Sequence, residues 1–133
     1  MPTNSPLAGI NVLIVEDRFI VAELHRQMIE AAGATVLGPA PNVERALHLS
    51  ESADIHAALL DVDLAGATCF ELVDRLRDRG TCVVFCTGFD RQQLPARYHD
   101  LPLFEKPIDY PSLINGIGDA ARHPGSGAGL RSR

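Results

Sequence analysis

Four places in the sequence carry residue types that together could handle a metal ion and a phosphate group. Each follows a short apolar run: Glu16-Asp17 after residues 10–15, Asp61 after 57–60, Thr87-Gly88 after 82–86, and Lys106-Pro107 just after Leu103-Phe104. Apolar runs of this length are typical of buried strands. In open α/β sheets, ligands bind at the carboxyl ends of the strands, which is where these polar residues would gather.

The gathered side chains suit magnesium and phosphate chemistry. Carboxylates held close together repel one another, and a hard divalent cation relieves that repulsion. Mg2+ binds one or two carboxylates and accepts phosphate oxygens among its remaining ligands. Lys106 would give a phosphate oxygen a point charge, and the Thr87 hydroxyl could donate to another. A carboxylate can also act as a nucleophile, and Asp61 is the expected acceptor because it is the central acid.

Alternating strands and helices are expected to position these residues. Strands are predicted at residues 10–15, 35–37, 57–60, 82–86 and 103–104, with Gly38-Pro39 closing the second. This alternation predicts a flavodoxin-like α/β fold, a doubly wound five-stranded parallel sheet of order 2-1-3-4-5 with helices on both faces. In that order the first and third strands are neighbours, which brings Glu16, Asp17 and Asp61 together.

Helical spacing of apolar residues predicts which helix faces pack on the sheet. The expected inward residues are Ile20, Leu24, Met28 and Ala31, then Val43, Ala46, Leu47 and Ser50, then Cys69, Leu72, Val73 and Leu76, and finally Leu113, Ile114, Ile117 and Ala121. Asn42 is suited to cap the second helix, and Thr68 with Glu71 the third. Pro111 suits the first turn of the last helix. Residues 90–100 contain a proline and should form at most one or two turns.

Composition bounds the class of protein. The chain has 133 residues, is 46% hydrophobic and carries a formal net charge of -5, which suits one soluble domain. The acidic balance argues against nucleic-acid and membrane partners, and no apolar run is long enough to span a bilayer. Three cysteines without paired spacing favour a reducing, cytoplasmic location. Residues 1–8 are expected to be a flexible lead-in, 9–122 the domain and 123–133 a flexible tail.

The ordered set of acids, threonine and lysine resembles the receiver domain of bacterial two-component response regulators, over residues 9–122. The resemblance implies that Asp61 accepts a phosphoryl group from a phosphohistidine of a sensor histidine kinase or a phosphotransfer protein. It implies that Lys106 and Thr87 hold phosphoryl oxygens. It also implies that the Lys106–Pro107 peptide bond is cis, which an X-Pro bond permits.

The same resemblance implies a set of Mg2+ ligands. Asp17 and Asp61 would bind the ion directly, and Glu16 would act mainly through water. The backbone carbonyl of Asp63 would complete the protein ligands.

A shorter stretch resembles a particular subgroup. Phe85-Cys86-Thr87-Gly88-Phe89 is similar to the Phe-x-Thr-Gly-aromatic signature of receivers common in alphaproteobacteria. Many of these are single-domain proteins linked to general stress signalling and to HWE-type histidine kinases. Ordinary receivers carry an aromatic residue three positions before the lysine, and here that position is Leu103. We therefore expect Phe89 to take part of the switching role, with Pro107 as a further switch candidate.

The expected output is contact with other proteins. Residues 123–133 are too few for a DNA-binding or enzymatic output domain, so the chain is expected to signal through protein–protein contacts or to drain phosphoryl from a kinase, and not to be an enzyme. Two alternatives stay open. One is a degenerate receiver that binds partners without phosphorylation. The other is a phosphatase of the haloacid dehalogenase type, whose Asp-x-Asp motif Asp61 and Asp63 match, although Ala65 stands where that family has threonine.

Overall fold

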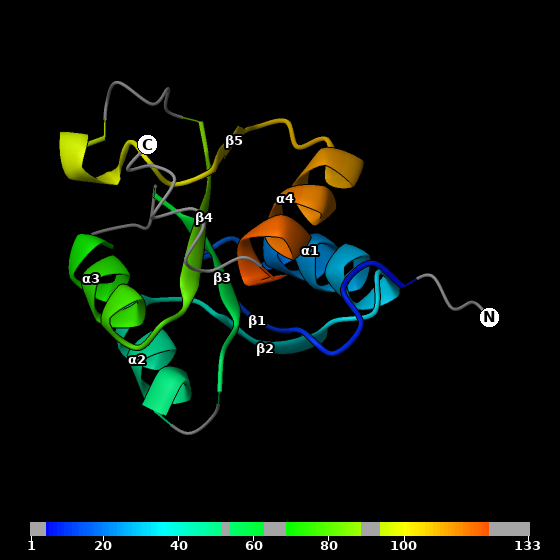
Figure 1. Cartoon of the computed structure of the whole chain (residues 1–133), viewed down its shortest axis with the longest axis horizontal. Coiled ribbons are helices and arrows are strands. Elements are labelled where there is room, and N and C mark those ends of the chain that lie inside the picture. Colours follow the sequence, from blue (N-terminus) through cyan, green and yellow to red (C-terminus); the bar gives the residue numbers. More distant parts are fainter. Residues whose placement is uncertain (1–4, 52–53, 63–68, 89–93, 123–133) are drawn as a thin grey trace.

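The centre of the molecule is a five-stranded parallel sheet (Figure 1). The computed structural model describes residues 5–51, 54–62, 69–88 and 94–122. The strands follow the order β2-β1-β3-β4-β5 and every neighbouring pair is parallel, which confirms the predicted class and order. They are β1 (Asn11–Val15), β2 (Thr35–Ala40), β3 (Ala57–Asp61), β4 (Cys82–Thr87) and β5 (Leu103–Glu105).

Helices cover both faces of this sheet, with α1 and α4 on one face and α2 and α3 on the other (Figure 1). The helices are α1 (Phe19–Ala31), α2 (Val43–Glu51), α3 (Phe70–Asp78) and α4 (Tyr110–Arg122), with the short 3-10 turn η2 (Ala96–Tyr98). Within residues 94–100, η2 is the single turn of helix, as predicted.

Two apolar cores lie on either side of the sheet, because successive side chains of a strand point to opposite faces. Leu13 and Val15 of β1 pack with α2 and α3, whereas Val12 and Ile14 pack with α1 and α4. Every residue of β3 is buried, as expected for a central strand covered on both faces. The inward residues predicted for α2, α3 and α4 are buried or half-buried, as predicted. This packing fixes the positions at which β1 and β3 end.

The residues predicted to start α2 and α4 do so in the structure. The Asn42 side chain accepts a hydrogen bond from the backbone N–H of Arg45 at 2.8 Å, so it caps α2 as predicted. Pro111 lies in the first turn of α4, where N–H groups have no intrahelical acceptor. Thr68 of the predicted capping box lies outside the described residues.

The inward face of α1 differs from the prediction. The buried residues of this helix are Ala22, His25 and Ile29. Ile20 is 80% exposed and Leu24 is 45% exposed, so their assignment to the core is wrong. Both sets recur at helical spacing, but the set containing the histidine faces inward because the side chain of His25 finds polar partners inside the fold. The predicted inward residues are exposed or half-buried instead: Ile20, Leu24, Met28 and Ala31.

Two segments are more extensively ordered than predicted. β2 continues through Gly38-Pro39 to Ala40, with a register shift in its pairing with β1. Leu7, in the expected lead-in, is fully buried, and its backbone N–H donates to the carbonyl of Ala32 at 2.8 Å. Residues 5–8 therefore pack against the fold. The flexibility expected of residues 1–4 and 123–133 stays a prediction, because both segments lie outside the described residues.

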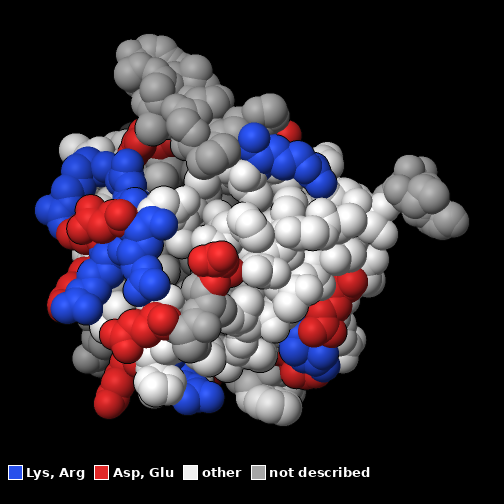
Figure 2. Space-filling view, turned by 60° about the horizontal axis from the view of Figure 1, so that its bottom comes forward, with Lys and Arg blue, Asp and Glu red and all other residues white. Residues whose placement is uncertain are grey.

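Charges are unevenly spread over the surface. Acidic and basic side chains are interspersed on the side of α2 and α3, whereas the side that carries α1 shows fewer charges (Figure 2). Among the described residues, the face in view does not present the continuous basic surface that non-specific nucleic-acid binding needs. None of the described helices has the length and apolar character needed to cross a membrane.

We predict that Leu7→Ala lowers the free energy of unfolding by about 2–4 kcal/mol, because truncating a fully buried leucine leaves a cavity. Leu24→Ala is the matched control, and because this side chain is 45% exposed and lies outside both cores, its loss should cost less than about 1 kcal/mol. Urea denaturation of both variants measures these costs. Equal costs for the two variants would contradict both burial assignments.

Candidate functional site

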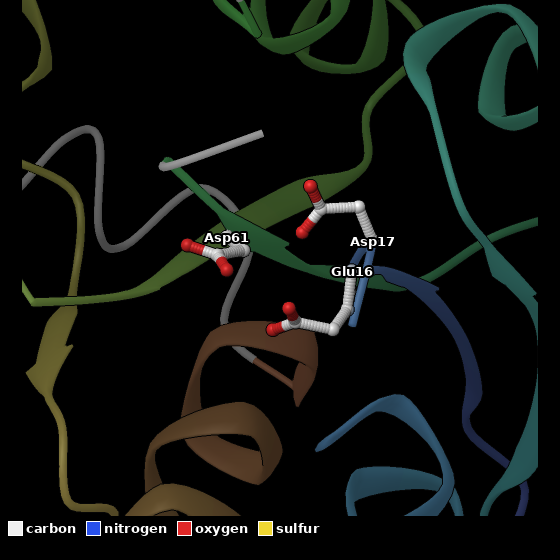
Figure 3. Close-up of side chains that lie close together, drawn as sticks. All are labelled: Glu16, Asp17 and Asp61. Atoms are coloured by element: carbon white, nitrogen blue, oxygen red, sulfur yellow. The ribbon is translucent and has the colours of Figure 1, made fainter. Parts of the chain in front are cut away.

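Three carboxylates from the ends of two neighbouring strands face one another (Figure 3). Glu16 and Asp17 directly follow β1, and Asp61 is the last residue of β3. The two strands pair in register up to Val15 and Leu60, so they end at the same level. Each acid offers an oxygen, and these oxygens lie within 4.8 Å of one another. The structure therefore brings together the three acids that the sequence places at one sheet edge.

Lys106 enters this acidic site from the loop that follows β5. Its Nζ lies 2.9 Å from Oδ2 of Asp61 and 3.6 Å from Oε1 of Glu16. Its backbone N–H donates to the carbonyl of Thr87 at 2.9 Å, and the Lys106–Pro107 peptide bond is cis, as the resemblance implies. Partial burial alone would lower the pKa of Lys106, but the contacts with Asp61 and Glu16 outweigh it and raise that pKa. The lysine is therefore a permanent cation in the site.

The neighbouring strand ends hold the remaining predicted residues that the structure describes. Thr87 is fully buried at the end of β4, one residue beyond Cys86, which pairs with Asp61. Gly88 follows and is exposed. Leu103 starts β5 opposite Phe85 and is half-buried. Asp63 and Phe89 lie outside the described residues, so the roles expected of them stay predictions.

Glu16 is a buried acid close to a second buried acid, Asp61. Its side chain is 2% exposed. Among the buried side-chain oxygen and nitrogen atoms of the described residues, Oε1 of Glu16 is the one that lacks a hydrogen-bond partner. Its Oε2 accepts a hydrogen bond from the backbone N–H of Arg18 at 3.2 Å. Burial, followed by the nearby Asp61, raises the pKa of Glu16 to about 7, although Lys106 opposes this. Without a metal, Glu16 therefore keeps a proton to a higher pH than a solvated glutamate does.

The donor set fits Mg2+. The group holds carboxylate oxygens from Glu16, Asp17 and Asp61 and no nitrogen or sulfur ligand, which is the preference of a hard cation. One lysine neutralises only one of three negative charges, so a divalent cation would restore the balance. A water held by that cation could also donate to the unpartnered Oε1 of Glu16.

A second group of polar side chains lies beside the acids, and the sequence did not predict it. His25 of α1 is 2% exposed, and its Nδ1 lies 2.8 Å from the hydroxyl of Tyr110 in α4. Its Nε2 lies 3.9 Å from Oε1 of Glu16 and 3.8 Å from Sγ of Cys86. The sequence signal was only a lone histidine at helical spacing from buried neighbours, a pattern common to core histidines with no function.

The sequence matches one family model and several known proteins. The family model described as the response regulator receiver domain matches residues 12–116. The chain is 33% identical over 119 residues to a cyclic di-GMP phosphodiesterase of Thermotoga maritima, covering 86% of this chain and 32% of that protein. It is 35% identical over 78 residues to the nitrate/nitrite response regulator NarL of Escherichia coli, covering 56% and 36%. The chain thus spans about a third of the length of these two relatives.

Solved structures give the same assignment. The response regulator PhyR from Brucella abortus superposes with a TM-score of 0.76 at 26% identity, covering 92% of this chain and 52% of that chain. SdrG from Sphingomonas melonis gives 0.72 at 30% identity, covering 84% and 94%. A CheY-like receiver domain protein from Methanospirillum hungatei gives 0.76 at 21% identity, covering 88% and 97%, which supports the fold alone.

We predict that, without divalent cations, Glu16 contributes a loss of stability as the pH rises from about 5 to about 8, which buried His25, with its pKa lowered to about 4, opposes in the lower part of this range. The folded protein keeps a proton on Glu16 up to a pKa of about 7, whereas the unfolded chain releases it near 4.5. Glu16→Gln should remove this dependence and raise the free energy of unfolding at high pH by about 1–3 kcal/mol. Denaturation in EDTA across this range measures both effects.

The matched control for this prediction is Glu44→Gln, which changes an exposed acid on α2 and should keep the wild-type pH dependence. A Glu16→Gln variant with the same pH dependence as the wild type would contradict the electrostatic account of the site.

The structure and the family match lead to one assignment. The family model covers residues 12–116, and the sheet order, the three clustered acids and the lysine after β5 fit that family. The chain belongs to the response regulator receiver domain family.

Proposed function

We propose that the chain is a working phosphoacceptor in which Asp61 takes a phosphoryl group from a phosphohistidine, with Mg2+ as cofactor. The observation that carries the proposal is the position of Lys106, whose Nζ lies 2.9 Å from Asp61 within a cluster of three carboxylates. Phosphoryl transfer depends mostly on positioning and charge neutralisation. An acceptor, a set of oxygen ligands and a cation for phosphoryl oxygens meet these needs in one place.

The proposed reaction is a transfer between two proteins. An Asp61 oxygen attacks the phosphorus of the phosphohistidine, and as the O–P bond forms, the P–N bond breaks and its electron pair leaves on the imidazole nitrogen. Lys106 turns from the Asp61 carboxylate to one phosphoryl oxygen, while the Thr87 hydroxyl donates to another. When bound, Mg2+ supplies positive charge at this point. Its proposed protein ligands are Asp17, Asp61 and the Asp63 carbonyl, with Glu16 acting through water.

We also propose membership of the Phe-x-Thr-Gly-aromatic subgroup common in alphaproteobacteria. The described part of the signature, Phe85 to Gly88, lies at the end of β4 beside the acidic site, which supports this assignment. Because Leu103 leaves the usual aromatic position without a ring, Phe89 takes over part of the switch, together with Pro107. The proposed partner is a histidine kinase, of the HWE type that the subgroup's pattern implies, or a phosphotransfer protein.

We propose that the exposed start of α1 contacts the phosphodonor. Phe19 and Ile20 are 79% and 80% exposed, and they follow Asp17 by two and three residues. A protein that brings a phosphohistidine to Asp61 must cover the rim of the site. Large apolar side chains exposed there would gain from burial against it. Downstream contacts would then use the side of η2 and β5, and the chain signals through them or drains phosphoryl from a kinase.

Intact mass after incubation with Mg2+ and acetyl phosphate tests the central step. We predict one added phosphoryl group per chain, which disappears in Asp61→Asn and in EDTA. Asp54→Asn is the matched control, because this acid is exposed and lies outside the acidic site, and it should label like the wild type.

The rival interpretation is a degenerate receiver that binds partners without phosphorylation. Absence of labelling, together with no rise in melting temperature on adding Mg2+ and beryllofluoride, would contradict the proposed function and favour that binding module. The family match removes the reason to consider a phosphatase of the haloacid dehalogenase type.

We predict that Phe19→Ala slows phosphotransfer from a histidine kinase about tenfold, because interface anchors typically contribute more than about 1 kcal/mol. The kinase is the one that labels the wild type fastest in a panel of purified kinases. Labelling by acetyl phosphate should not change, since this small donor makes no contact with α1. Equal rates for wild type and variant with the kinase would rule out this docking surface.

A further inference from the structure

We propose that His25, oriented by Tyr110, is a positioning residue that holds Glu16 in the metal site. The inference rests on the proposed function, since it assigns a role towards the same Mg2+ site. His25 lies behind the acid that would bind the ion through water, and it acts on the site through that acid.

The two residues join the helices that cover one face of the sheet. His25 comes from α1 and Tyr110 from the first turn of α4. The hydroxyl of Tyr110 lies 2.8 Å from Nδ1 of His25, and the two rings meet edge to face with centroids 5.8 Å apart. His25 is 2% exposed, so this contact is shielded from water and fixes the direction in which the imidazole points.

A neutral imidazole carries one N–H, and its surroundings decide which nitrogen holds it. His25 is 2% exposed, and burial disfavours a charged imidazole, so the ring is neutral at pH 7. Burial also raises the pKa of Tyr110 to about 12, so its hydroxyl keeps a proton to donate. With that proton donated to Nδ1, the imidazole N–H lies on Nε2.

The atoms facing Nε2 favour the same arrangement. Oε1 of Glu16 lies 3.9 Å away and Sγ of Cys86 lies 3.8 Å away. The carboxylate oxygen is an acceptor, and the thiol sulfur of Cys86 can act as a weak acceptor or a weak donor, so the carboxylate decides. An N–H on Nε2 therefore meets an acceptor, whereas a lone pair there would face the carboxylate unfavourably.

Glu16 has a specific need for this donor. Its Oε1 is buried without a hydrogen-bond partner, and Lys106, 3.6 Å away, is shared with Asp61. Because Lys106 lies closer to Asp61, His25 is a second donor that already faces this oxygen in the unphosphorylated protein, and a shift of about 1 Å closes the hydrogen bond. Hydrogen bonds of this kind orient metal-binding carboxylates, and losing one typically lowers metal affinity about 10–100-fold.

Calorimetric titration of the unphosphorylated protein with Mg2+ tests the proposal. His25→Leu should weaken binding at least about tenfold. His25→Gln should restore most of the affinity, because its amide N–H can occupy the place of Nε2–H. Tyr110→Phe removes only one oxygen, so it tests the proposal even if His25→Leu does not fold, and it should weaken binding by about threefold or more.

The matched control is Tyr98→Phe, which removes the hydroxyl of the chain's other tyrosine. That hydroxyl interacts with Asp74 and Arg97 at η2 and α3, away from the acids. Tyr98→Phe should bind Mg2+ with wild-type affinity.

Nitrogen-15 NMR of the imidazole provides a readout that does not depend on the metal. Wild-type His25 should carry its proton on Nε2, and Tyr110→Phe should shift population towards Nδ1–H. A wild-type proton on Nδ1, or unchanged Mg2+ affinity in both His25→Leu and Tyr110→Phe, would overturn the inference and leave the proposed function standing. If the wild type binds no Mg2+, the proposed function and this inference both fail.

Discussion

Three carboxylates share one lysine, and the rest of the site depends on this imbalance of charge. Glu16 and Asp61 are each 2% exposed, so water screens them little, and Lys106 contacts both. Burial and the nearby Asp61 raise the pKa of Glu16 to about 7, so the metal-free site favours a proton on one of its two buried acids. A divalent cation removes that need, and a phosphoryl group gives the lysine a competing partner. The charge balance of the site therefore changes when a divalent cation or a phosphoryl group binds.

Packing elsewhere in the fold must hold these repelling groups together. β3 is buried along its whole length between two apolar cores, and β1 pairs with it in register up to the last residues before the acids. Burial of this apolar surface offsets the electrostatic cost of bringing Glu16, Asp17 and Asp61 within reach of one another. The apolar packing on both faces of the sheet therefore also holds the three acids in place at its edge.

The sequence was enough to predict the fold and the acidic site, because both follow from local patterns. An acid after a buried strand must lie at the sheet edge, and strand order then places Asp61 beside Glu16 and Asp17. The inward face of α1 could not be read this way. His25 faces the core because its ring hydrogen-bonds there to Tyr110, which lies 85 residues away in the sequence. A pattern of neighbouring residues cannot predict a contact of that sequence separation. The same holds for Leu7, which is buried through its contacts with the rest of the fold.

The most direct test of this account is a crystal structure of the protein grown with Mg2+ and beryllofluoride. We predict beryllofluoride on the Asp61 carboxylate, one Mg2+ held by Asp17 and Asp61, and Lys106 Nζ moved from its 2.9 Å contact with Asp61 to a fluoride. An intact Lys106–Asp61 pair with neither metal nor beryllium bound, at concentrations that saturate other receivers, would contradict the account.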